Sequence, residues 1–210
     1  MNQRNALRLL ALAGLASTIA LAAEISKVKD AIEVAVDGGT AAFIAPTNVA
    51  AISIKGKSAA LHAQVAMHKT ADGLVLEHIE ATLPVKSLLT GMSLRDEHMR
   101  KHIFTTADGQ IPDLKFEGDN SACAAQTKET LCQVTGNLSI RGVAHAFTLA
   151  LKIKEEGAQY RASGDTVVKL SDYGIEQPTQ FGVKSSNEVQ LHLDFVAKPA
   201  PAHVALAGAR

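Results

Sequence analysis

The chain has 210 residues, with 21 basic and 21 acidic side chains, so its formal net charge is zero. It contains no Trp, 6 Phe and 2 Tyr, a composition that supplies neither a basic surface nor an aromatic stacking platform for nucleic acid. We therefore expect no nucleic-acid partner. Because all-β barrels of about 200 residues commonly form one unit, we expect a single domain.

Residues 1–22 have the three parts of a secretory signal peptide. Arg4 and Arg8 supply the positive start, and residues 9–21 form an uncharged, mainly apolar run. Ala20-Leu21-Ala22 matches the small-x-small pattern at which signal peptidase cleaves. The run is shorter than the ~20 residues that span a bilayer, which makes an uncleaved anchor the lesser alternative. We expect a periplasmic or secreted protein.

Between residues 23 and 197 the dominant period of the apolar residues is two, which indicates β-strands. Arg141-Gly142 and Glu156-Gly157 are typical of tight turns between strands. Short turns between about eight to ten strands predict an antiparallel barrel or sandwich. The candidate strands lie at 32–36, 43–44, 52–54, 61–67, 74–85, 114–116, 134–140, 143–153, 160–170 and 189–195.

One short helix interrupts this β pattern, and we expect it at residues 94–103. Ser93 is the candidate N-cap, with Asp96 three residues later as in a short-armed capping box. Basic side chains favour its last turn through the helix dipole. Its apolar residues can cover the strand ends as a lid: Met92, Met99, Ile103 and Phe104, with Arg95, Glu97 and Lys101 facing outward.

Two cysteines flank a polar stretch at residues 124–131. In an oxidising compartment we expect Cys123 and Cys132 to form a disulfide that closes the neck of a hairpin loop. Their spacing is not C-x-x-C, and no His lies nearby, so redox and metal-binding roles are disfavoured. Residues 198–210 contain two prolines and many alanines without periodicity, and we expect a disordered tail there.

Four ordered motifs resemble those of a known family. Residues 95–99, RDEHM, then Phe104 and residues 112–116, PDLKF, are similar to the R-D-x-H-L, F and P-x-I-x-F series of the YceI-like family. Residues 134–143, VTGNLSIRGV, resemble that family's V-x-G-x-L-T-I-x-G-V hairpin, and residues 169–175, KLSDYGI, resemble its R-x-D-F-G-I block. The family comprises exported lipid-binding or polyisoprenoid-binding proteins. The resemblance implies an all-β, antiparallel, lipocalin-like barrel of about eight strands with one short helix.

The resemblance also implies that the apolar interior holds an isoprenoid lipid, with an isoprenoid quinone as one candidate, and no other cofactor. An envelope membrane protein is a candidate partner, and a homodimer is one candidate oligomeric state. The residues themselves give Asp172 and Tyr173 most simply as a strand end and turn, with Tyr173 covering one end of the core. The alternative is that they contact a ligand head group at the barrel mouth. Arg95 and Arg141 are candidates for the same contact, or are solvated or salt-bridged surface residues. The expected lining and mouth residues are Leu61, Val65, Met99, Phe104, Phe116, Leu138, Ile140, Phe147, Leu149, Tyr173, Leu191 and Leu193.

Two other readings of the sequence stay open. His98 and His102 are four residues apart on the expected helix, a spacing that can place two imidazoles on one metal ion. However, Met99 follows the first His where a metalloprotease has its catalytic Glu. The sequence also has no nucleophile elbow, glycine-rich phosphate loop or convincing acid and base pair. We therefore predict a protein that is not an enzyme. The alternatives are a metal-dependent enzyme using these histidines, or a packed envelope stress or interaction protein without a ligand.

Overall fold

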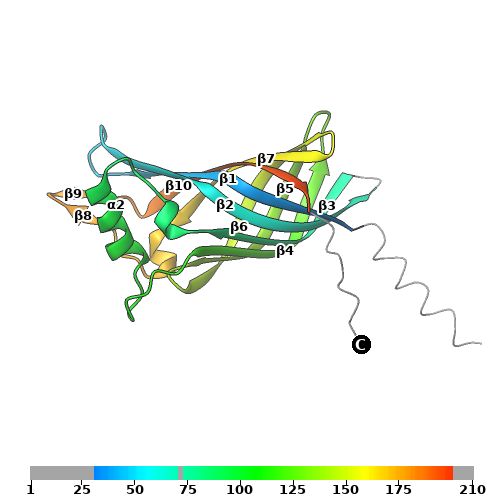
Figure 1. Cartoon of the computed structure of the whole chain (residues 1–210). Coiled ribbons are helices and arrows are strands. Elements are labelled where there is room, and N and C mark those ends of the chain that lie inside the picture. The colour runs from blue at the N-terminus through cyan, green and yellow to red at the C-terminus, as the bar shows by residue number, and fades with distance from the viewer. Residues whose placement is uncertain (1–30, 71–72, 201–210) are drawn as a thin grey trace, which may run out of the picture. The chain divides into compact units, whose positions relative to one another are not determined.

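Eight antiparallel strands close into a barrel in the computed structural model, which describes residues 31–70 and 73–200 (Figure 1). Their order around the barrel is β1-β10-β7-β6-β5-β4-β3-β2. This confirms the predicted all-β barrel. The strands are β1 (Ile32–Pro46), β2 (Ser53–Thr70), β3 (Gly73–Leu83), β4 (Leu114–Ala125), β5 (Thr130–Ile140), β6 (Val143–Glu156), β7 (Gln159–Lys169) and β10 (Glu188–Pro199).

The expected signal peptide lies outside the described residues, as do residues 201–210 of the expected tail. Lys198 and Pro199 pair with β1, so β10 extends two residues beyond the expected end of the barrel at residue 197. No helix within the described ranges combines the length and apolar character needed to cross a membrane.

Strand β1 is continuous where the sequence pattern indicated two short strands. A bulge shifts its register between Val36 and Thr40. Gly38 has a φ of +89°, and a Cβ on Gly39 would lie 2.6 Å from Cβ of Phe195. The bulge therefore needs both glycines, and it resets the alternation of inward residues that would otherwise identify one long strand.

Short helical elements cover one end of the barrel (Figure 1). They are η1 (Val85–Ser87), α2 (Ser93–Met99) and η2 (Arg100–Phe104), and the last has π-helical hydrogen bonding. The predicted helix is confirmed, but Ser93 is not its N-cap. Met92 holds that position, without a side-chain capping bond.

Two elements lie in the segment between β7 and β10, where the sequence indicated only a turn. These are η3 (Leu170–Tyr173) and a small hairpin of β8 (Thr179–Gln180) and β9 (Val183–Lys184). The hairpin forms its own two-stranded sheet. It is tied to the β1–β2 loop, where Asn48 N donates to Lys184 O at 2.9 Å.

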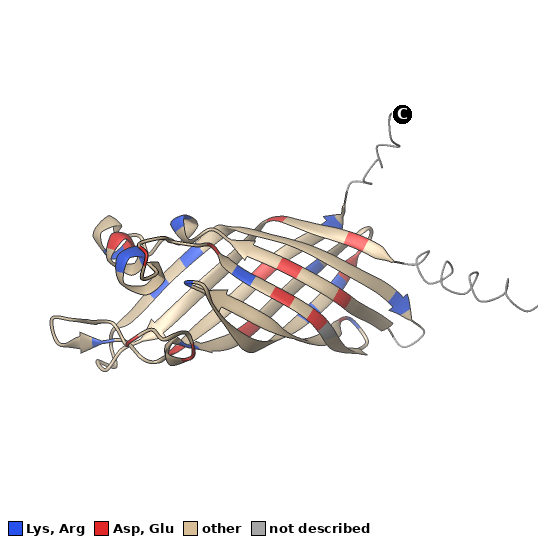
Figure 2. Cartoon of the chain, turned by 90° about the horizontal axis from the view of Figure 1, so that it is seen from below, with Lys and Arg blue, Asp and Glu red and all other residues tan. Residues whose placement is uncertain are grey.

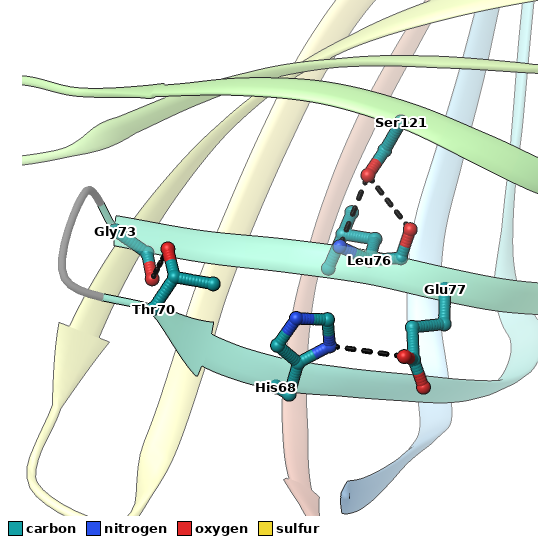
Figure 3. A network of polar contacts seen from close by, with 6 residues as sticks. All are labelled: His68, Thr70, Gly73, Leu76, Glu77 and Ser121. Atoms are coloured by element: carbon teal, nitrogen blue, oxygen red, sulfur yellow. Dashed lines mark hydrogen bonds and ion pairs between the residues drawn. The ribbon is translucent and has the colours of Figure 1, made fainter. Parts of the chain in front are cut away.

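A serine side chain continues the sheet where the β3–β4 ladder ends (Figure 3). Backbone pairing stops at Ile79 and Gly118. Further along, Ser121 Oγ accepts a hydrogen bond from Leu76 N at 3.0 Å and donates one to Leu76 O at 2.7 Å. The Ser121 hydroxyl thereby satisfies backbone groups that the diverging strands leave unpaired. On the other side of β3, Nδ1 of His68 lies 3.0 Å from Oε1 of Glu77.

Cys123 and Cys132 form the predicted disulfide across β4 and β5, where they face each other with their Cα atoms 4.0 Å apart. Replacing both by Ser is expected to lower the free energy of unfolding by about 2 to 3 kcal/mol, because a small covalent loop restricts the unfolded chain. Urea unfolding with and without dithiothreitol measures this. Reductant should destabilise the parent chain and leave the double variant unchanged; equal stability of both chains without reductant would contradict the prediction.

Candidate functional site

A cavity of about 170 Å³ lies inside the barrel and is lined by residues from all eight strands. Its lining is mainly aliphatic and aromatic, and the polar residues among the described residues that line it are Thr82, Lys115, Tyr160 and Thr166. An engineered cavity of about 150 Å³ with such a lining stays dry and binds benzene. The barrel interior is therefore partly hollow and suited to apolar ligands.

Eight of the expected lining residues border this cavity: Leu61, Val65, Phe116, Leu138, Phe147, Leu149, Leu191 and Leu193. Small residues on β2, β3 and β7 leave much of the space. Ala63 and Ala81 face each other on neighbouring strands, and Ala162 lines the cavity from β7. Their short side chains leave space that a larger apolar side chain would fill.

The other four expected site residues do not border the cavity. Met99, Phe104, Ile140 and Tyr173 are buried in a second apolar cluster, together with Val85 and Leu88 from the helix end. These four residues pack the barrel end beneath the short helices, whereas Leu88 of the same cluster also borders the cavity. The cavity therefore reaches the inner side of this packed end.

Tyr173 is buried in the packed helix end of the barrel. It is 3% exposed, and its ring centroid lies 6.0 Å from that of His145. Burial, with a smaller effect from the neighbouring Asp172 carboxylate, raises the pKa of Tyr173 to about 12. The phenol is therefore neutral at physiological pH and serves as part of the packed end.

The helix is fixed to the preceding loop through Asp96, which is 4% exposed. Its Oδ1 accepts hydrogen bonds from the backbone N of Thr90 at 2.7 Å and from the hydroxyl of Thr90. Arg95 donates to the same residue, from Nε to Oγ1 at 2.9 Å and from Nη2 to the backbone O at 2.8 Å. Arg95 therefore holds the loop and does not simply face outward as expected.

An ion pair crosses the opposite end of the barrel. Lys69 Nζ lies 2.5 Å from Glu155 Oε1, and these residues belong to β2 and β6, which are not neighbours in the sheet. The hydrogen bond to Glu155 raises the pKa of Lys69. Tyr160 is buried near this ammonium group and lines the cavity. The two cavity ends thus differ: one is packed under helices, and the other is bridged by charged side chains.

The family assignment rests on most of the chain. A family model described as the YceI-like domain matches residues 20–197. The chain belongs to the YceI-like family. A UPF0312 protein of Pseudomonas paraeruginosa is 28% identical over 123 residues, which are 56% of this chain and 60% of that protein. One from Pseudomonas savastanoi pv. phaseolicola is 30% identical over 106 residues, 48% of this chain and 53% of that protein. The matched region therefore spans less than two thirds of these relatives.

Solved structures of low sequence identity share the fold of this YceI-like chain. Burkholderia cenocepacia BcnA is 22% identical with a TM-score of 0.61, over 78% of this chain and 99% of BcnA. A polyisoprenoid binding domain from Saccharophagus degradans, implicated in plant cell wall breakdown, is 12% identical with a TM-score of 0.60, over 80% of this chain and 99% of that domain. A YCEI protein from Campylobacter jejuni is 18% identical, with a TM-score of 0.55, and covers 70% of this chain and 86% of that protein.

Asp96→Ala is expected to destabilise this YceI-like chain by about 2 kcal/mol, because the amide and hydroxyl of Thr90 lose their acceptor. The Thr90 hydroxyl, more than its amide or the nearby arginines, lowers the pKa of Asp96 below 3.8. A lowered carboxyl pKa gives stability that is present above pH 3.8 and is lost as the pH falls through the folded-state value.

Urea unfolding as a function of pH tests this prediction. Glu97→Ala, at an exposed position, is the matched control, and its free energy of unfolding should stay close to that of the parent chain. The difference in free energy of unfolding between Asp96→Ala and the parent should shrink as the pH falls below 3.8. Equal stability of the two alanine variants at neutral pH would contradict a structural role for Asp96.

His98 and His102 lie side by side on the helical segment, with ring centroids 5.7 Å apart and planes nearly perpendicular. Within the described ranges, no group of three or more His, Cys, Asp or Glu side chains is placed to hold a metal ion. Two imidazoles alone do not make up the three protein ligands of a catalytic zinc site.

Proposed function

We propose that this chain binds a polyisoprenoid lipid in the barrel cavity and, as an exported protein, carries, stores or sequesters it. The observation that supports this most is the apolar cavity of about 170 Å³. Family membership and the fold shared with the polyisoprenoid binding domain of S. degradans add to it. An isoprenoid quinone fits the same chemistry.

The lining favours binding through the hydrocarbon tail. Each five-carbon isoprene unit moved from water contributes about 3 to 4 kcal/mol before association and ordering costs, at ~0.8 kcal/mol per buried carbon group. A cavity slightly larger than one that holds benzene takes a short branched segment without rearrangement. A longer chain extends beyond this space towards one end of the barrel, and among the described residues no helix covers the end that Lys69 and Glu155 bridge.

The lining also favours binding over catalysis. Among the described residues that line the cavity, none has a carboxylate, imidazole or thiol, which are common groups for acid–base and nucleophilic chemistry. Its few polar groups are dispersed over β3, β4 and β7. A polar head group therefore gains most by remaining at a barrel end.

Mass spectrometry of an organic extract from the purified protein tests the proposal. We expect a prenyl lipid in stoichiometric amount, and we expect delipidated protein to take up a labelled prenyl alcohol from detergent solution. Absence of a co-purified lipid, together with failure of the folded, delipidated chain to take up the prenyl alcohol, would overturn the proposal.

A further inference from the structure

Three segments form one surface at the end of the barrel that carries the helix. They are residues 44–57, residues 86–101 and residues 179–184, and we call them the helix-end surface. Figure 1 shows α2, the β1–β2 loop and the β8–β9 hairpin together at this end. Backbone hydrogen bonds join them: Asn48 N donates to Lys184 O, and Lys57 N donates to Leu89 O, both at 2.9 Å.

Phe181 is the most exposed large apolar residue of this surface, at 97%. It occupies the two-residue turn between β8 and β9 with a φ of +49°, followed by Gly182 at +78°. Left-handed backbone is unfavourable for a bulky residue, and this ring gains no burial within the chain in return. The hairpin is held in place, because Asn48 Oδ1 accepts from Lys184 N at 2.8 Å. An aromatic ring is thus presented to the surroundings on a supported turn.

Other exposed apolar residues gather on the same surface. Of the ten exposed large hydrophobic residues in the described ranges, seven belong to the helix-end surface: Ile44, Val49, Ile52, Leu89, Met92, Leu94 and Phe181. Scattered single residues of this kind are ordinary on protein surfaces, but their concentration on one face marks an interaction site.

Positive charge coincides with these apolar residues. The helix-end surface has seven basic and two acidic residues, whereas the rest of the described chain has nine basic and sixteen acidic residues. Figure 2 shows Asp and Glu mainly along the barrel wall. One of the two acids is the buried Asp96. Within the described chain, the ion pairs formed by Lys or Arg involve Lys69 and Arg161, which lie outside this surface.

We propose that the helix-end surface docks onto a lipid bilayer that contains anionic lipids. Exposed apolar side chains at an interface insert among the lipids, and surrounding cations pair with lipid phosphates. Five of the seven cations are Lys, a residue that is depleted in protein–protein interfaces. This composition favours a membrane over a protein partner. Docking places the helix-covered barrel end against the bilayer, and it does not depend on which ligand the cavity takes.

Co-sedimentation of the full chain with vesicles tests the docking. We expect binding to phosphatidylcholine vesicles that contain phosphatidylglycerol and much weaker binding to phosphatidylcholine alone. Phe181→Asn should reduce partitioning about tenfold through lost apolar contact. This change keeps the turn, because Asn-Gly suits two positive φ values. The double variant Lys55→Gln and Lys184→Gln should partition about 25-fold more weakly onto the anionic vesicles, at roughly fivefold per cation removed.

Val167→Ser is the matched control, because this exposed residue lies on β7 outside the helix-end surface. It should bind as the parent does. Absence of binding to anionic vesicles, or equal binding by the parent and both test variants, would overturn the docking. So would sedimentation velocity that shows the surface joining two copies of the chain, with vesicle binding unaffected by the variants.

The same proteins separate docking from ligand binding. Phe181→Asn should take up prenyl alcohol from detergent solution as the parent does, since Phe181 does not line the cavity. A chain that binds vesicles but takes up no prenyl alcohol contradicts only the proposed function. A chain that takes up the ligand but binds no anionic vesicles contradicts only the docking.

Discussion

Gly136→Ala is expected to lower the free energy of unfolding by about 3 kcal/mol, the upper part of the usual range for an overpacked interior. A Cβ at this position would lie 2.1 Å from the backbone O of Glu117 and 2.6 Å from Cα of Gly118. Both obstacles are backbone atoms of β4, so no rotamer change can relieve the clash. Gly136 does not have a positive φ, and the substitution therefore tests the available space without adding backbone strain.

Gly118 and Gly136 face each other across β4 and β5, and their close approach shapes the cavity wall. A Cβ on Gly118 would lie 3.0 Å from Cε1 of Phe116 and equally close to Cγ1 of Val134. The absent side chains leave room for the Phe116 ring, which packs edge-on against Phe147 at a centroid distance of 6.2 Å. Both rings line the cavity.

Urea unfolding of Gly136→Ala and of Asn137→Ala measures the effect. Asn137 is exposed on the adjacent position of β5, and its substitution should change stability by no more than about 0.5 kcal/mol. A Gly136→Ala chain as stable as this control would mean that β4 and β5 are farther apart than described.

The sequence alone predicts the barrel well because alternation is a direct consequence of strand geometry. Each strand of a closed barrel has one face inside, so a period of two persists through β2, β5, β6 and β10. The prediction fails locally where extra residues change the phase. At Gly38 the bulge inserts a residue into β1, and the pattern then reads as two short strands.

Alternation identifies the inward face but not the depth of a residue along the barrel. Leu138 and Ile140 share one face of β5, yet only Leu138 borders the cavity, and Ile140 packs at the helix end. The alternation of apolar residues does not indicate how far along the barrel axis a residue lies. Met99 and Phe104 were expected at the ligand for the same reason: their apolar character is evident, whereas the depth of the packed end depends on the closed sheet.

The contacts that hold helix α2 show a second limit of prediction from the sequence. Ser93 and Asp96 have the local spacing of an N-terminal cap, but the acceptor function of Asp96 is used by Thr90, six residues earlier. The loop before the helix brings Thr90 to Asp96. Thr90 lies outside the helix, so helical periodicity does not predict this contact. The same loop explains why Arg95 and Asp96 occur together in the motif, since both bind Thr90.

Ala63→Phe is expected to lower the affinity for a prenyl chain by about a hundredfold. Ala63 lines the cavity and is only partly buried. A phenyl ring is as large as the benzene that a cavity of about 150 Å³ holds, so one substitution occupies most of the 170 Å³. Excluding one isoprene unit forfeits roughly 3 kcal/mol, which corresponds to about a hundredfold in affinity.

Ala150→Phe is the matched control, because Ala150 lies between the inward Leu149 and Leu151 and is exposed on the outer face of β6. Titration of delipidated protein with a fluorescent prenyl analogue compares the two variants, and thermal unfolding verifies that both fold. If Ala63→Phe does not fold, Ala81→Met fills the same space from the neighbouring strand β3 with a flexible side chain. Folded cavity variants that bind as tightly as Ala150→Phe would place the lipid outside the barrel. Loss of binding in the cavity variants alone would instead place the hydrocarbon chain beside Ala63 and Ala81, where paired small residues on β2 and β3 keep the interior open.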